Sequence, residues 1–560
     1  MTTPRTLRSA LVAAALSVPL LASCAADRDG AEGASAPTGL TTPEPTTTTL
    51  DPERAAIDAR SYYENYEAST SDVAMASPPA AAALAERSVS ALATESTMPH
   101  LPPYPPVPIE PGPLDDNTFV DPGASSWRSP DQQARSTFAL DVDTGSFSVA
   151  RRFVAEGSRP DPASIRIEEW INAVDPGGPP AVDGALAIDA TAAASPYAPG
   201  VELVRVAVAS RELDAADRPP ANITFVVDTS GSMDIRARLG LVQSSLALLA
   251  RTLRDDDTVA IVTYGTEASP VLEPTPASQT ATIVSAIERL RAGGSTNMEA
   301  GLRLGYQQAR EGFRQDGVNV VVLASDGVAN VGRSDPDGLV ELIRDSGAEG
   351  ISLVTVGYGM GNFNDDLMEQ LADQGDGFYA YVDTFEEAER LFVDQLTPTL
   401  TVVAREAKAQ VEFDPEVVAE YRLVGYENRT LDAGQFRDDT VDAGEVGGGH
   451  HAVALYEIRR TADGVGRSPG TATLRWLPVG GDIAEERTAV LPSDPGPAKD
   501  RLRLDALVAA TAEWLRSDPA ALERGLDLDR LVADGEALVA AGTDGATEIA
   551  ELLRGLRQLG

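Results

Sequence analysis

The most constraining feature of this chain is a regular alternation of short apolar runs and amphipathic segments between residues 219 and 398. Each run is almost continuously apolar, which is typical of a strand buried on both faces of a parallel sheet. The runs span residues 223–227, 259–264, 318–324 and 351–356. The segments with helical periodicity span residues 239–253, 280–291, 298–313, 339–346, 365–373 and 384–395. Strands that alternate with helices predict an α/β domain on a doubly wound, mostly parallel sheet.

Both flanks of this α/β domain predict further structure. An α+β region is expected over residues 115–218, with strands at 137–142, 185–191 and 201–209 and helices at 147–156 and 165–174. A β-rich region is expected over residues 399–496, where the apolar period changes to two, with strands at 400–404, 409–413, 452–458 and 472–477. Helices are expected in the last region, 497–560, at 501–517 and 547–559. Half-apolar strands on both flanks need a face to cover, so we expect the two β regions to pack together.

The amino terminus resembles a bacterial lipoprotein signal. Arg5 and Arg8 precede an apolar run over residues 11–21, and small residues lead into Cys24, the one cysteine of the chain. The run is too short to remain as a membrane-spanning helix. The resemblance implies that residues 1–23 are removed and that Cys24 carries lipid, which would anchor the protein outside the cytoplasm on the bacterial cell membrane. The alternative is an ordinary cleaved signal peptide with an incidental cysteine.

Residues 24–114 are rich in Pro, Thr and Ala. Such a composition buries too little apolar surface to offset the entropy of ordering, so it predicts a disordered tether. A helix is expected around residues 52–66, and the prolines of 99–113 favour an extended conformation at the end of the tether.

The chain is strongly acidic, with a formal net charge of −41. A surface of this sign repels nucleic acid and suits divalent cations or basic partners. The simpler alternative is that the charge only keeps the protein soluble.

Oxygen-bearing side chains follow the ends of two predicted strands. Asp228, Ser230 and Ser232 come directly after the first strand, and Asp326 comes after the strand 318–324. A glycine-rich turn that opens a helix offers Thr296. The loops at the carboxyl ends of strands form the ligand crevice of a doubly wound sheet. Carboxylates and hydroxyls are hard ligands, suited to Mg²⁺ or Ca²⁺ and not to zinc.

This pattern resembles the metal-ion-dependent adhesion site of the von Willebrand factor type A domain, a Rossmann-like fold. The resemblance implies that Ser230, Ser232 and Thr296 supply hydroxyl ligands, and that Asp228 and Asp326 bind the metal directly or through water. It implies a divalent cation, Mg²⁺ first with Mn²⁺ or Ca²⁺ as alternatives. One coordination position is left for an acidic side chain of a partner protein. The alternative is a site that folds but binds no metal.

The flanking motifs around residues 138–147, 165–172 and 441–458 resemble a bacterial group of lipoproteins with this domain, and the likeness covers residues 115–560. Asp234, just beyond the motif, is expected to be a solvated side chain, with tuning of the metal site as the alternative.

Catalytic interpretations are weaker. Asp143-Thr144-Gly145-Ser146 resembles one half of an aspartic protease site, but no second Asp-Thr-Gly exists to share the proton. We expect a strand-end turn with solvated acids there, with calcium binding by Asp141 and Asp143 as the alternative. A serine hydrolase needs a base, and the chain has only His100, His450 and His451. His100 falls in the tether, and the adjacent pair is expected to form a turn into a strand, with its side chains on opposite faces.

We therefore expect no enzyme. The sequence favours a membrane-anchored extracytoplasmic protein that binds a protein partner through a metal bridge. The alternative is an envelope scaffold or sensor in which the domain is structural and metal binding is incidental.

Overall fold

The computed structural model describes residues 52–68 and 119–560, with short gaps at 120, 122, 124, 141–142, 176, 214–217, 328–335, 360–363, 397–400, 427–429, 432–434 and 438–443. The expected signal sequence, Cys24 and most of the expected tether lie outside these residues. Among the helices of the described part, none combines the length and the apolarity needed to cross a bilayer.

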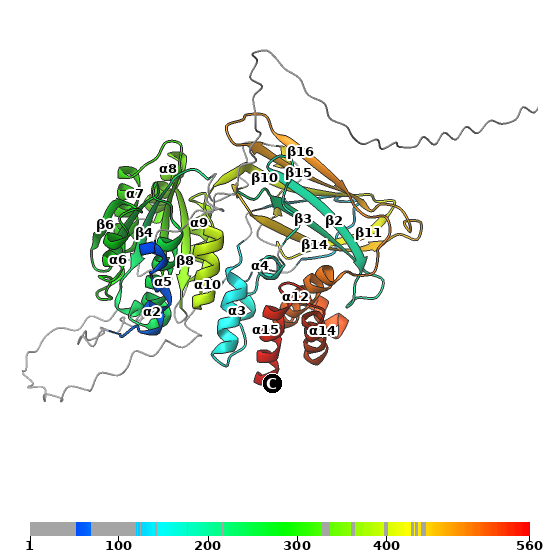
Figure 1. Ribbon diagram of the computed structural model, residues 1–560. Coiled ribbons are helices and arrows are strands. Elements are labelled where there is room, and N and C mark those ends of the chain that lie inside the picture. Colours follow the sequence, from blue (N-terminus) through cyan, green and yellow to red (C-terminus); the bar gives the residue numbers. More distant parts are fainter. Residues whose placement is uncertain are drawn as a thin grey trace, which may run out of the picture. The chain divides into compact units, whose positions relative to one another are not determined.

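A six-stranded mixed sheet forms the centre of the α/β domain, in the order β6-β5-β4-β7-β8-β9 (Figure 1). The parallel strands are β4 (Ala221–Asp228), β5 (Thr258–Tyr264), β7 (Val318–Ser325), β8 (Ser352–Tyr358) and β9 (Tyr379–Val382). The doubly wound sheet predicted from the sequence is therefore confirmed. Two strands of this sheet were not predicted: β6 (Ala268–Pro276), which is antiparallel and half-exposed at the sheet edge, and the short strand β9.

Helices cover both faces of this sheet because successive residues of each strand point to opposite sides. In β4, Phe225 and Val227 pack with helices α5 (Leu241–Thr252), α6 (Thr280–Ile287) and α10 (Phe385–Glu389). Val226 faces the other layer, formed by α7 (Met298–Glu311), α8 (Pro336–Ala348) and α9 (Asp365–Asp373). Both faces are thus buried, as the unbroken apolar run required.

The two flanks pair with each other. One sheet has the order β12-β1-β10-β15-β16, with β13 beside β10, and the other has the order β11-β14-β3-β2. Their bounds are β1 (Arg135–Ala139), β2 (Leu186–Ala194), β3 (Glu202–Ser210), β10 (Val402–Phe413), β11 (Val418–Val424), β12 (Thr430–Leu431), β13 (Val446–Gly447), β14 (His451–Arg460), β15 (Gly470–Pro478) and β16 (Glu485–Val490). Strand β1 pairs with β10, and β3 pairs with β14. The expectation that strands before and after the α/β domain pack together is confirmed.

The sheet β11-β14-β3-β2 is buried on both faces. Val204 and Val206 of β3 face the other sheet, whereas Leu203 and Ala207 face helices. The helices are α3 (Gly145–Ala155), α4 (Ile167–Val174), α12 (Asp500–Arg516), α13 (Pro519–Arg524), α14 (Leu528–Ala540) and α15 (Ala546–Leu559). Helices α13 and α14 were not predicted from the sequence.

The helix expected around residues 52–66 is present as α1 (Pro52–Ala55) and α2 (Ala59–Glu64). It packs against the α/β domain through Tyr62, Tyr63 and Tyr66. Arg54 donates hydrogen bonds to the Leu253 carbonyl and to Asp255. The aromatic side chains give this segment an apolar face, which its Pro- and Thr-rich surroundings lack.

Candidate metal centre

Both candidate carboxylates lie at the carboxyl end of the sheet. Asp228 is the last residue of β4, and Asp326 directly follows β7, the neighbouring parallel strand. Both side chains are fully buried. The register of the two strands, in which Val227 pairs with Ala324, brings the two loops to the same edge. The structure therefore brings together the two acids that the sequence suggested.

The loop that carries Thr296 is attached to the serine loop through the backbone. The amide of Gly293 donates to the Thr229 carbonyl at 2.6 Å, and the amide of Gly231 donates to the Gly294 carbonyl at 3.1 Å. Thr296 is buried beside these contacts. All three predicted loops thus converge on one site.

The hydroxyls of the motif lie next to each other. Ser230 Oγ is 3.0 Å from Ser232 Oγ, and the Ser230 amide donates to Asp228 Oδ1 at 2.8 Å. This last contact folds the loop back over the end of its strand and brings the backbone of Ser230 next to the Asp228 carboxylate. Such a set of oxygen donors fits a divalent cation of the Mg²⁺ type.

The electrostatics of the site also fit a cation. Burial, together with the charge of Asp326, raises the pKa of Asp228 to about 7. Its Oδ2 atom accepts hydrogen bonds from Ser325 Oγ at 3.1 Å and from the Tyr264 hydroxyl at 3.3 Å. A divalent ion between two buried carboxylates compensates their negative charge.

Sequence reasoning missed Ser325, Tyr264 and Arg238 as parts of this site. Ser325 and Tyr264 end the strands β7 and β5, so their place at the carboxyl edge of the sheet was a usable signal. Arg238 lies in the π-helical turn η4 (Arg236–Gly240). It precedes residues 239–253, whose periodicity predicts a helix, so no sequence pattern marked it. Its Nη1 atom donates to Asp326 Oδ2 at 2.7 Å.

The expectation that Asp234 is solvated is wrong. Asp234 is buried, with 7% of its surface exposed, and its Oδ1 accepts a 2.8 Å hydrogen bond from the Tyr66 hydroxyl. The partner comes from α2 and its following turn, far away in sequence, which is why local sequence could not reveal it.

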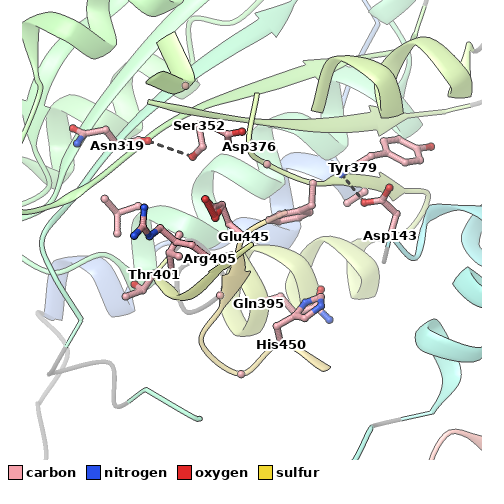
Figure 2. Close-up of a pocket in the computed structure, with 18 of the residues that line it drawn as sticks. Asp143, Asn319, Ser352, Asp376, Tyr379, Gln395, Thr401, Arg405, Glu445 and His450 are labelled. Atoms are coloured by element: carbon pink, nitrogen blue, oxygen red, sulfur yellow. Dashed lines mark hydrogen bonds between the residues drawn. The ribbon is translucent and has the colours of Figure 1, made fainter. Parts of the chain in front are cut away.

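The expectation of solvated acids at Asp143 is wrong as well. Asp143 is buried and accepts a 3.0 Å hydrogen bond from the Tyr379 amide, at the start of β9 (Figure 2). Its carboxylate lies within 4.8 Å of those of Glu169 and Glu369, and Arg166 pairs with both glutamates, at 3.5 Å and 2.7 Å. This Asp-Thr-Gly segment thus belongs to a buried ion-pair network, which explains its acidic residues without protease chemistry. Asp141 lies outside the described residues.

The histidine pair borders a separate cavity of about 470 Å³, which Figure 2 shows in close-up. It lies at the amino ends of β7, β8 and β9, whereas the candidate metal ligands lie at the carboxyl ends of β4 and β7. Neutral His450 donates from Nε2 to the Leu140 carbonyl at 2.9 Å, and burial lowers its pKa to about 4. The ring centres of His450 and His451 are 6.5 Å apart. His451 begins β14, so the predicted turn into a strand is confirmed.

Profiles of known families match successive stretches of the chain. The profile "von Willebrand factor" matches residues 114–205, "von Willebrand factor type A domain" matches 222–394, and "Uncharacterized protein YfbK, C-terminal" matches 398–476.

Individual proteins are similar too. "Uncharacterized protein YfbK" of Escherichia coli (strain K12) is 37% identical over 412 residues, which cover 69% of this chain and 72% of that protein. "Uncharacterized protein sll0103" of Synechocystis is 33% identical over 189 residues, 34% of this chain and 44% of that protein. The solved structure "von Willebrand factor type A from Catenulispora acidiphila" superposes with a TM-score of 0.40 at 16% identity, covering 66% of this chain and 89% of that one.

Proposed function

Because this chain belongs to the family of bacterial von Willebrand factor type A domain proteins that includes YfbK of Escherichia coli, we propose that it binds a protein partner through a divalent metal bridge. The metal, Mg²⁺ in our proposal, is held by Asp228, Ser230, Ser232, Thr296 and Asp326. When bound, it supplies a Lewis-acidic position that an acidic side chain of the partner can occupy.

The observation that carries this proposal is the convergence of three loops on one buried pair of carboxylates. Asp228 and Asp326 lie at the same sheet edge, the Ser230 and Ser232 hydroxyls lie 3.0 Å apart, and the Thr296 loop is attached to them by backbone hydrogen bonds. Burying two acids side by side is unfavourable unless a cation compensates them. A site of this kind is built for a positive ion.

We further propose that the protein is no enzyme. A hydrolytic serine would need a general base within hydrogen-bond reach, and the two histidines in the described residues, His450 and His451, border the cavity at the other end of the sheet. We also propose the location: a lipid anchor at Cys24 on the outer side of the bacterial cell membrane, as the amino-terminal sequence suggests.

Metal binding itself is tested by thermal unfolding. A ligand that binds the native state raises its stability by RT ln(1 + [L]/Kd), which is about 2.7 kcal/mol at a concentration of 100 Kd. Addition of Mg²⁺ should raise the Tm of the wild-type protein and leave that of the Ser230→Ala/Ser232→Ala variant unchanged. Equal shifts in both proteins would show that Mg²⁺ binds elsewhere.

Partner binding is tested by capture from membrane extracts of the source bacterium. The wild-type protein in Mg²⁺ should retain a partner that is lost with a chelator and with the Ser230→Ala/Ser232→Ala variant. If the same partner is retained under all conditions, the metal does not form the bridge.

One observation favours a second candidate, an envelope scaffold or sensor in which metal binding is incidental. The ion pair between Arg238 and Asp326 partly compensates the buried acids without any metal. Under this alternative, the partner is retained in chelator, and Mg²⁺ leaves the Tm unchanged.

A further inference from the structure

We propose that Arg238 determines the charge of the loaded metal site and thereby its preference for an anionic ligand. The inference rests on the proposed function, since it concerns the same metal and the same open coordination position. It assigns a specificity-determining role to a residue outside the ligand pattern of the motif.

Arg238 bridges two of the ligand loops. One nitrogen, Nη1, donates to Asp326 Oδ2 at 2.7 Å and to the Ser232 carbonyl at 2.9 Å. The arginine is 4% exposed and Asp326 is fully buried. A guanidinium remains protonated at any physiological pH, so its charge is a permanent part of this site.

The position of the guanidinium is fixed from both sides. Gly359, one residue past the end of β8, has a φ of +74°, and a Cβ atom there would lie 2.7 Å from Arg238 Cγ. The arginine stem therefore lies directly against backbone. On the other side, the turn η4 is covered by the amino-terminal segment: Tyr66 packs on Gly240, and Arg236 lies over the Tyr63 ring at 5.0 Å. Arg238 is thus buried, with Gly359 against its stem and the amino-terminal segment over its turn.

The formal charges then give different loaded sites with and without this arginine. Counted over ionised Asp228, ionised Asp326 and Arg238, the formal charge is −1, and a divalent cation converts it to +1. Buried Asp234 on the same loop contributes equally with and without the arginine, so Arg238 raises the charge of the site by one unit in either case. Without Arg238, the same metal would leave the site neutral. A desolvated site with a positive charge attracts a carboxylate much more strongly than a neutral one.

The positive charge of Arg238, which favours an anionic ligand, disfavours binding of the metal cation itself. A fixed cation beside Asp326 repels a second cation and draws electron density away from that ligand. Arg238 therefore weakens metal binding while it strengthens binding of the anion that completes the coordination. A residue with only a packing role would change neither quantity in this paired way.

The experiment uses Mn²⁺ as the probe metal and acetate as the probe anion, followed by water proton relaxation of the protein-bound Mn²⁺. We compare wild type, Arg238→Gln, Arg238→Lys and a matched control, Arg236→Gln. Arg236 lies on the same turn and its loss changes the net charge equally, but its side chain is exposed and stacks on Tyr63. Chloride at the same ionic strength controls for screening.

We expect Arg238→Gln to bind Mn²⁺ about tenfold more tightly and acetate about tenfold more weakly than wild type, because one unit charge close to the ion is removed. Arg238→Lys, which keeps the charge, and Arg236→Gln should resemble wild type. Unchanged Mn²⁺ and acetate affinities in Arg238→Gln would overturn the inference. Absence of Mn²⁺ binding in every protein, wild type included, would instead contradict the proposed function.

If Arg238→Gln does not fold, the wild-type protein still decides the question. A loaded site with a positive charge should bind acetate at least about tenfold more tightly than acetamide, a neutral oxygen ligand of similar size. Equal affinities for the two would overturn the inference.

Discussion

The Tyr66 hydroxyl donates a 2.8 Å hydrogen bond to Asp234 Oδ1, two residues after Ser232. This contact joins the amino-terminal segment of α1 and α2 to the loop that carries the candidate metal ligands. Asp234 is buried, and Tyr66 is half-buried against Gly240. The segment before the folded α/β domain is thus part of the structure around the candidate metal ligands.

We predict that Tyr66→Phe lowers the stability of the protein by about 1 to 2 kcal/mol, because a buried carboxylate loses a hydrogen-bond donor. Urea unfolding would measure the loss. Tyr62→Phe is the matched control: it removes a hydroxyl from α2 of the same amino-terminal segment, and in the described residues Tyr62 is half-buried and does not hydrogen-bond to Asp234. Equal losses of unfolding free energy in the two variants would show that the hydrogen bond to Asp234 contributes nothing beyond the removal of a tyrosine hydroxyl.

A second prediction concerns pH and Asp228. Its pKa is raised in the metal-free native state to about 7, so the native state binds a proton that the unfolded chain releases near pH 4. The free energy of unfolding of the metal-free protein should therefore fall as the pH rises from about 4 to about 7. The Asp228→Asn variant should lack this contribution, which is read as the difference between the two pH profiles. Mg²⁺ should reverse the loss near pH 7, and its affinity should rise with pH through the same window.

His450 gives a pH dependence of the opposite sign. Its pKa is lowered to about 4 by burial and by His451, whereas the unfolded chain protonates near 6.5. Its contribution to stability should be complete above about pH 6.5 and should decrease as the pH falls toward 4. We expect His450→Gln to reduce the loss between pH 7 and pH 5 by roughly 2 kcal/mol, measured by urea unfolding at both values. A loss as large as that of wild type would show that His450 is already protonated when folded.

The contact between Gly145 and Tyr379 predicts a steric effect. A Cβ atom at Gly145 would lie 2.4 Å from Tyr379 Cε1, and that ring is fully buried. Gly145→Ala should therefore destabilise the protein by about 1 to 3 kcal/mol through overpacking. Gly496→Ala, where nothing lies within 4 Å of the added atom, should change the Tm little. A Tm for Gly145→Ala that equals that of Gly496→Ala would contradict this account.

The parts of the fold that could be predicted are those fixed by local pattern. Strand β4 and its loop are an unbroken apolar run followed by Asp228, and this pattern was sufficient to place the carboxylate at a sheet edge. Strand β6 was missed because its prolines, Pro270 and Pro274, and its exposed alternate residues are typical of an edge strand or a loop. Strand β9 has only four residues, too few for a period to be recognised.

The parts of the site that could not be predicted depend on tertiary contacts. Asp143 and Asp234 were expected to be solvated, as most acids in turns are. Each instead meets a tyrosine residue distant in sequence, Tyr379 or Tyr66. From its local sequence, Arg238 is equally typical of an exposed residue at the start of a helix. Its burial follows from the ion pair with Asp326, which only the tertiary structure shows. Burial of a charge is decided by its partner, and the partner is not in the local sequence.

The pairing of β1 with β10 has a consequence for biosynthesis. Arg135 and its partner Glu412 are 277 residues apart, with the whole α/β domain between them. A ribosome that adds about 5 to 20 residues per second releases β1 many seconds before its neighbour exists. During that interval Phe138 has no sheet to cover it, and the intervening domain folds first and brings the two ends of its chain together. The order of synthesis thus completes the chain of the α/β domain before the surrounding β structure can close.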